Sequence, residues 1–282
     1  MKQKVQVVWL WIGLALALAA PAAPAELVFS APPREAGAGG DDSYGPIADF
    51  IAKVVGQKVV YQNPGNWLTY QSEMRKGQYD IVFDGPAFIG WRMSHLDHQP
   101  LVKFPGELSF VVIVRKDQGK ISELKDLAGR TLCAHAPPNL ATLTVQFEFD
   151  NPMRQPLVLE TMGFPSAYKG VVSGRCVGAI LQGKILAELD KEAQAVKVVF
   201  KSKGLPNQAF SAGPRLGPEM REKLSAALLS PEGLQATEKL RARFKIKEFV
   251  RAQPQEYAGL GKLMRDVYGF DDNAADKTAK HR

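Results

Sequence analysis

The chain has 282 residues, 45% of them hydrophobic, and 36 Lys and Arg against 29 Asp and Glu give it a formal net charge of +7. This length is enough for one large or two medium domains with proper cores. The positive charge is mild and spread along the sequence without a basic block, so it favours anionic ligands weakly and does not indicate nucleic-acid binding.

Residues 1–25 have the pattern of an export signal. Lys2 and Lys4 precede an apolar run at 7–20, and Ala23-Pro24-Ala25 fits a small-residue cleavage site. The run is short for a membrane span, which needs roughly 20 residues. We therefore expect a cleaved signal peptide and a soluble protein in the periplasm, with an uncleaved N-terminal anchor as the alternative.

Short strands and helices alternate along the next stretch. We expect strands at 26–30, 58–62 and 79–83, and helices at 43–55 and 67–76. Ser43 is the expected N-cap of the first helix, and Gly56 and Gly77 follow the two helices. Strand, helix, strand, helix, strand with short links is typical of a parallel α/β sheet.

The same alternation restarts after an extended apolar segment at 108–115. Further elements are expected, in chain order, as a linker helix at 121–127, a strand at 131–134, a helix at 140–149, a strand at 156–160, a helix at 166–173, and strands at 176–181 and 196–201. A second extended crossing is expected at 205–213. Helices at 219–229, 233–244 and 257–267 follow, and the polar tail 271–282 is expected to be disordered.

This order predicts an α/β clam-shell of two lobes, each a mostly parallel sheet flanked by helices. Lobe 1 is expected to comprise 26–107 and 208–270, and lobe 2 to comprise 108–207, with two extended hinge crossings between them. The ligand site is expected between the lobes, at the carboxyl ends of strands and at helix N-termini, with the lobes closing over the ligand.

The segment 129–149 is the clearest candidate for one wall of that site. It reads as a strand, a turn rich in proline and small residues, and a helix, so its helix N-terminus could bind a small anion. An ordinary strand-to-helix connection is the alternative. Cys133, in this strand, and Cys176 are the only cysteines; in an oxidising compartment a structural disulfide is the simplest interpretation, with a metal pair or reactive thiols as alternatives.

Four short motifs carry a resemblance to a known family. They are Tyr44-Gly45-Pro46-Ile47-Ala48-Asp49-Phe50, Gly77-Gln78-Tyr79-Asp80-Ile81, Gly85-Pro86-Ala87-Phe88 and Asp126-Leu127-Ala128-Gly129-Arg130-Thr131. Over most of residues 26–240 the chain resembles the periplasmic substrate-binding proteins of phosphonate, phosphite and phosphate ABC transporters. The resemblance implies a type 2 periplasmic-binding-protein fold, a small oxyanion or related polar ligand of the phosphonate-like class, and delivery to an ABC permease in the inner membrane.

The chain departs from that family where the ligand would bind. The family's serine- and threonine-rich turn reads Pro137-Pro138-Asn139-Leu140-Ala141-Thr142, and the acidic position of its later strand is Val177. The fold therefore transfers from the family, and the ligand does not.

Nine residues are the candidate ligand-binding set: Tyr44, Asp84, Gly85, Phe88, His135, Asn139, Thr142, Ser166 and Asn207. Four of them have a structural alternative. Tyr44 fits a core tyrosine equally well, Asp84 a turn former, His135 a solvated loop histidine and Ser166 a plain N-cap.

Other functions have less support. His95 and His98 invite a metal interpretation, but two histidines without a Cys or carboxylate partner are weak evidence, so surface histidines are favoured and no metal site or cofactor is predicted. No enzyme motif is present. We expect a monomeric solute-binding protein, and the alternative is a periplasmic sensor input or accessory partner, which would bind a sensor ectodomain in place of the permease.

Overall fold

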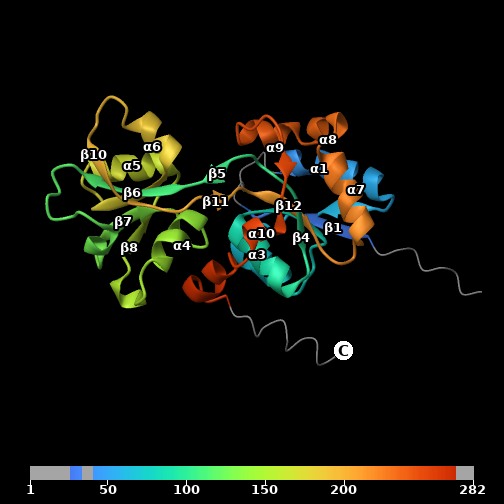
Figure 1. The fold of residues 1–282 in the computed structure, drawn as a ribbon, viewed down its shortest axis with the longest axis horizontal. Helices are drawn as coiled ribbons and strands as arrows, with labels where there is room; N and C mark the ends of the chain where they lie inside the picture. The colour runs from blue at the N-terminus through green and yellow to red at the C-terminus, as the bar shows by residue number, and fades with distance from the viewer. Residues whose placement is uncertain (1–25, 34–40, 271–282) are drawn as a thin grey trace, which may run out of the picture.

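The computed structural model describes residues 26–33 and 41–270, so the expected signal peptide and polar tail lie outside the described residues. Two separate sheets form two lobes that lie side by side, and the short strands β5 and β11 run between them (Figure 1). Across the described part of the chain, every helix is too short or too polar to cross a membrane. The expected two-lobed α/β class is confirmed.

Lobe 1 is built on a six-stranded sheet in the order β13-β4-β12-β3-β1-β2. The strands are β1 Leu27–Ser30, β2 Val59–Tyr61, β3 Ile81–Asp84, β4 Gln99–Lys103, β12 Ala209–Ala212 and β13 Val250–Arg251. β1 pairs in parallel with β2 and β3, whereas β12 pairs antiparallel with β3 and β4. The sheet is therefore parallel on one side and antiparallel on the other.

Alternate residues of these strands face two helical layers, as the two-residue period of a strand requires. Phe29 and Phe83 face one layer, and Val28 and Val82 face the other. The first layer holds α1 Asp41–Val55, α7 Pro218–Leu228, α8 Pro231–Ala236 and α9 Glu238–Arg243. The second layer holds α2 Trp67–Arg75, α3 Pro86–His95 and the π-helix η3 Leu263–Val267. The short helix α10 Pro254–Tyr257 packs beside α3.

Lobe 2 is built on a five-stranded sheet in the order β10-β6-β9-β7-β8. The strands are β6 Phe110–Arg115, β7 Thr131–Ala134, β8 Leu157–Glu160, β9 Gly178–Gln182 and β10 Val196–Lys201. The helices are α4 Leu140–Phe147, α5 Phe164–Val172 and α6 Gly183–Leu189, with short 3-10 turns η1 Leu124–Leu127 and η2 Pro152–Arg154. One face of the sheet packs on α4 and the other on α5 and α6.

The crossings between the lobes pair with each other. β5 Glu107–Leu108 and β11 Leu205–Pro206 form an antiparallel ribbon in which Leu205 lies opposite Leu108. One crossing leaves lobe 1 and the other returns to it. Each crossing leads into a strand, β6 or β12, that pairs antiparallel with its neighbours, so both sheets are mixed and the expectation of mostly parallel sheets is wrong in this detail.

Several expected boundaries also need correction. α1 begins at Asp41, two residues before the expected cap Ser43. α5 begins at Phe164 with Gly163 as its N-cap, so Ser166 lies inside the first turn and does not cap the helix. Several elements are absent from the sequence-based prediction, among them α3, β4, α6 and β13. The expected helix at 233–244 is divided at Thr237 into α8 and α9.

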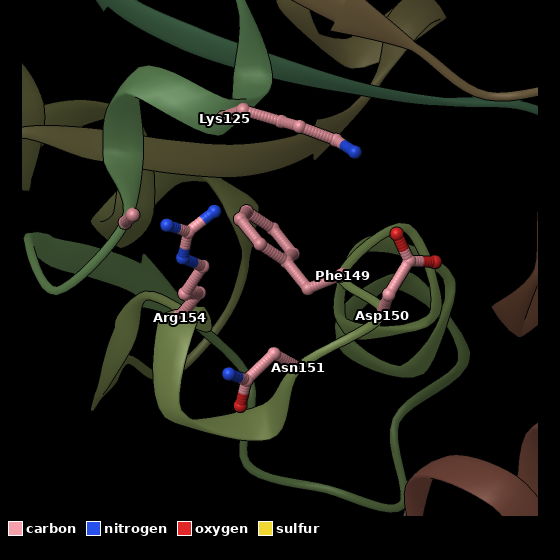
Figure 2. A pocket seen from close by; sticks show the side chains of 6 residues that line it. Lys125, Phe149, Asp150, Asn151 and Arg154 are labelled. Atoms are coloured by element: carbon pink, nitrogen blue, oxygen red, sulfur yellow. The ribbon is translucent and has the colours of Figure 1, made fainter.

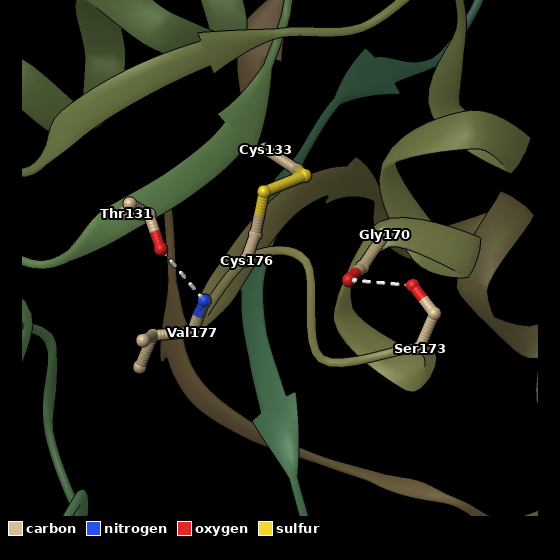
Figure 3. The surroundings of a disulfide bond; sticks show 6 residues. All are labelled: Thr131, Cys133, Gly170, Ser173, Cys176 and Val177. Atoms are coloured by element: carbon tan, nitrogen blue, oxygen red, sulfur yellow. Dashed lines mark hydrogen bonds between the residues drawn. A yellow bond between two sulfur atoms is a disulfide. The ribbon is translucent and has the colours of Figure 1, made fainter.

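The disulfide between Cys133 and Cys176 is confirmed, with a Cα–Cα distance of 5.7 Å (Figure 3). β7, which holds Cys133, pairs in parallel with β9, and Cys176 lies just before β9. Gly170 of α5 faces the bridge, because a Cβ atom there would lie 2.5 Å from the Cys133 sulfur. The backbone N–H of Val177 donates to the Thr131 hydroxyl beside it. The bridge therefore joins β7 to the residues just before the neighbouring strand β9, under a closely packed helix.

Candidate functional site

The lobe 1 side of the expected site is the N-terminus of α3, which follows β3 directly. Gly85 is the N-cap with an extended backbone, and Pro86 occupies the first turn, where a missing N–H costs nothing. Asp84 ends the strand, and its Oδ1 accepts the Gly85 N–H at 2.7 Å. The carboxylate thus uses one of the backbone donors that a ligand could otherwise take.

Asp84 is fully buried and belongs to a charged cluster inside lobe 1. Its Oδ2 accepts a short hydrogen bond from the Tyr70 hydroxyl and lies 3.5 Å from Nε of Arg92, which is also fully buried. Arg92 Nη2 donates to the Tyr70 hydroxyl at 2.9 Å, and its guanidinium lies over the rings of Tyr70 and Tyr79. Burial raises the pKa of Tyr70 well above its usual value, so the phenol stays protonated and can donate. This arrangement gives Asp84 a structural role inside the lobe.

Tyr44 and Phe88 are both buried in aromatic groups. Tyr44 is 3% exposed and stacks on Tyr61 with ring centroids 4.9 Å apart. Phe88 stacks on Trp67 at 5.9 Å and meets the Tyr70 ring edge-on. Their aromatic faces are therefore covered mainly by other side chains of lobe 1.

In lobe 2 the threonine hydroxyls near the start of α4 bond to the backbone of the chain itself. Thr142 is buried and donates to the carbonyl oxygen of His135 at 2.6 Å, and Thr144 donates to that of Leu140 at 2.7 Å. Asn139 is the N-cap of α4, and its side chain accepts the Ala141 N–H at 3.0 Å. The hydroxyl protons and one of the first helical N–H groups are thus already engaged.

His135 and Ser166 both belong to lobe 2 but differ in environment. His135 is half-buried and meets the ring of Phe164 edge-on, with centroids 5.2 Å apart. Burial lowers the pKa of His135, although Glu160 opposes that shift, so the imidazole is neutral at pH 7. Ser166 is exposed on the first turn of α5.

Asn207 lies in the hinge. It is 7% exposed, its Nδ2 donates to the carbonyl oxygen of Pro105 at 3.3 Å, and its own carbonyl oxygen accepts the Tyr257 hydroxyl at 2.8 Å. It therefore ties the two crossings to each other and to α10.

Of the nine candidates, Phe88 is the one that shares a buried cluster with the opposite lobe. Leu143 of α4 is fully buried in the same apolar cluster as Phe88, and Leu140 packs against it. The lobes thus meet on an apolar contact beside the N-terminus of α4. Arg92, Tyr70 and Leu143 lie beside candidate residues, and the sequence-based prediction does not include them. A signal existed for Arg92, a charged residue one helical turn after Phe88 on a buried face.

The two histidines considered for metal binding have other partners. His95 is exposed, stacks on Trp91 at 4.5 Å, and its Nδ1 lies 2.8 Å from the Trp91 carbonyl oxygen. His98 is buried, and its Nδ1 lies 3.2 Å from the Ser211 hydroxyl. Among the residues that the structure describes, no three His, Cys, Asp or Glu side chains cluster as metal ligands would.

A cavity of about 370 Å³ lies on lobe 2 around the buried ring of Phe149 (Figure 2). Its other lining residues are all exposed: Lys125, Ala128, Asp150, Asn151 and Arg154. Exposed charges are screened by water and by salt. The cavity lacks the buried, convergent polar groups that fix a ligand in a binding site.

The sequence matches one family over both lobes. Residues 29–257 match the family described as "ABC transporter, phosphonate, periplasmic substrate-binding protein". The chain belongs to this family. The match extends from β1 to the end of α10 and so includes both crossings.

Known relatives agree with this assignment at low identity. The phosphate-import protein PhnD of Mycolicibacterium smegmatis is 23% identical over 227 residues, which cover 71% of this chain and 70% of that protein. PhnD1 of Prochlorococcus marinus, solved with methylphosphonate, has a TM-score of 0.61 at 14% identity and covers 86% of this chain and 98% of its own. A Xanthomonas citri protein solved with ATP has a TM-score of 0.66 at 14% identity, covering 88% and 99%. At such identities the structures show the shared fold alone.

The family is the substrate-binding component of a transporter. The hydroxyls that the sequence retains, Thr142 and Thr144, both donate to backbone carbonyl groups. Val177, at the position where the resemblance implies an acidic residue, is half-buried against the lobe 2 core.

Proposed function

We propose that this protein captures a small oxyanion or related polar solute between its lobes in the periplasm and delivers it to an inner-membrane ABC permease. The family match across both lobes and their crossings carries this proposal. Two helix N-termini, those of α3 and α4, supply backbone N–H groups suited to an anion. The lobes are proposed to comprise 26–107 with 208–270 and 108–207, with cleavage after residue 25 and a monomeric mature protein.

The solute is proposed to be bound mainly by backbone N–H groups and by His135, since the hydroxyls of the α4 turn donate elsewhere. The His135 side chain is half-exposed, and within the described residues its ring contacts Phe164 edge-on and makes no hydrogen bond. A neutral imidazole can donate one hydrogen bond without adding charge. A site made of backbone N–H groups and one imidazole would select a solute by its shape and negative charge. The phosphonate sites typical of the family use several serine and threonine hydroxyls instead.

A thermal-shift screen tests the proposal. Phosphate, phosphite, alkylphosphonates and sulfonates are added separately, and a true ligand at 100 times its Kd stabilises the folded state by about 2.7 kcal/mol. His135→Gln should reduce the shift for the active solute, and the control His95→Gln should leave it unchanged. If no compound of the panel raises the melting temperature, the import proposal fails.

A second candidate is a sensor or accessory role on the same fold. The observation that favours it is the apolar contact of Leu143 with lobe 1, where a polar solute would gain few partners. Co-purification from a periplasmic membrane fraction separates the two roles. Recovery of a permease supports import, and recovery of a kinase ectodomain or exported oxidoreductase supports the second role.

A further inference from the structure

The C-terminal segment 254–270 contacts lobe 1, the hinge and lobe 2. In Figure 1 it runs from α10, beside α3, towards α4 of the other lobe. We propose that this segment, which we name the C-terminal strap, holds the two lobes together without ligand, and that opening requires residues 263–270 to part from α4. The inference concerns the resting position of the lobes and does not depend on the identity of any solute.

The strap is fixed to lobe 1 by a close backbone approach. Gly261 lies so near α3 that a Cβ atom there would fall 2.9 Å from both N and Cα of Trp91. Further along, the Phe270 ring meets the Trp91 ring edge-on at 5.1 Å and lies under the Arg75 guanidinium at 4.7 Å. Tyr268 accepts a hydrogen bond from the side chain of Gln71 at 3.3 Å. Side chains and backbone therefore both anchor the strap on α2 and α3.

The start of the strap is tied to the hinge. The buried Tyr257 hydroxyl donates to the carbonyl oxygen of Asn207 at 2.8 Å, next to the crossing β11. Glu256 accepts a short hydrogen bond from Lys103, at the end of β4 before the other crossing. A change in the angle between the crossings therefore moves the first turn of the strap.

Leu143 is the fully buried side chain that lobe 2 supplies to the strap, and Leu140 packs against the same cluster. Its neighbours on α4, Ala141 and Val145, pack into the core of lobe 2, but Leu143 is fully buried in the cluster that contains Met264 and Phe270. Separation of the lobes would expose these apolar side chains to water, which is unfavourable. The contact therefore biases the protein towards the closed arrangement.

Gly261→Ala tests the strap by pushing it off α3 without touching lobe 2. The matched control is Gly217→Ala, where a Cβ atom meets nothing within 4 Å. Hydrogen exchange without ligand should become at least ten-fold faster in α4 of the Gly261 variant, with α5 of the same lobe unchanged. Unchanged exchange in α4, or equal acceleration in α4 and α5, would overturn the inference.

The reciprocal experiment starts from lobe 2. Leu143→Ala should accelerate exchange in residues 263–270 and increase the radius of gyration in solution scattering. Val145→Ala, which removes a neighbouring α4 side chain from the lobe 2 core, should do neither. If Val145→Ala accelerates exchange in residues 263–270 as much as Leu143→Ala does, the effect comes from general destabilisation of lobe 2. That result would refute the proposed role of the strap. Both readouts are independent of the solute screen, so either proposal can fail alone.

Discussion

The hydroxyl of Thr142 donates to the carbonyl oxygen of His135 at 2.6 Å and so closes the turn between β7 and α4. Both residues are candidates for ligand binding, yet the Thr142 hydroxyl fixes the backbone of His135. A side chain that bonds to its own turn contributes to the shape of the site, and its proton is unavailable to a solute. This relationship leads to a direct test of what Thr142 does.

Thr142→Val should lower the free energy of unfolding by about 1 kcal/mol, because it removes one buried hydrogen bond and keeps the branched shape. Urea unfolding measures the change. Thr142→Ser, which keeps the hydroxyl, is the control and should retain that hydrogen bond. A Val variant with unaltered stability and a solute affinity reduced ten-fold or more would show that the hydroxyl serves the ligand instead.

The buried pair of Asp84 and Arg92 predicts strongly coupled effects on stability. Arg92→Met leaves the Asp84 carboxylate buried without its cation, and such losses cost about 3–5 kcal/mol. Asp84→Asn removes the charge but keeps an oxygen for the Tyr70 hydroxyl.

A double-mutant cycle by urea unfolding checks this coupling. The variant carrying both Arg92→Met and Asp84→Asn should be less destabilised than the two single effects added together, since no unpaired charge remains. Strict additivity would contradict the role assigned to the pair. In that event Asp84 would have to act independently of Arg92.

Protonation of His98 should make stability depend on pH. Burial, followed by the charges of Arg92 and Arg221, holds the pKa of His98 well below its usual 6.5. Below about pH 6.5, His98 is therefore protonated in the unfolded chain and neutral in the folded chain. The free energy of unfolding consequently falls as the pH falls through this window. Urea unfolding between pH 7.5 and 5.0 should show a smaller loss for His98→Gln than for the wild type.

His135 is the internal comparison for that experiment. Its pKa is also lowered by burial, but it is half-exposed and Glu160 opposes the shift. His135→Gln should accordingly reduce the pH dependence less than His98→Gln does. Equal slopes for the wild type and His98→Gln would show that His98 does not control acid stability.

Sequence reasoning succeeded where the signal is local. The strands Thr131–Ala134 and Val196–Lys201 have the predicted bounds, because an apolar or β-branched run with clear flanking turns defines each one. The family motifs supplied the clam-shell class. α3 is absent from the prediction because Gly85 and Pro86, at its N-terminus, and Gly90, in its interior, weaken the helical pattern.

The environment of the candidate site could not be predicted because it depends on partners far away in sequence. Tyr44 stacks on Tyr61, and Asp84 bonds to Tyr70, so neither fits the solvent-lined wall that its place in the sequence suggests. Leu143 follows the expected helical pattern, but nothing local reveals that its face meets lobe 1. Tertiary contacts decide whether a polar or aromatic side chain is available to a ligand.

Removal of the Cys133–Cys176 bridge should destabilise lobe 2 in particular. The cysteines are 43 residues apart, and in the chain-entropy model a loop of this length stabilises the fold by about 4 kcal/mol. The double variant Cys133→Ala with Cys176→Ala should lose about that much in urea unfolding. Its hydrogen exchange should accelerate in β7 and α5, and lobe 1 strands such as β1 should be little affected.

Reduction of the wild type with dithiothreitol supplies the matched experiment, since it opens the bridge without changing any side-chain volume. It should reproduce most of the loss, and the reduced double variant should show no further change. Native protein that yields two titratable thiols before reduction would contradict the bridge. A loss of stability shared equally by both lobes would show that the two sheets unfold as one cooperative unit. In that case the strap and the hinge couple the lobes more strongly than their separate cores suggest.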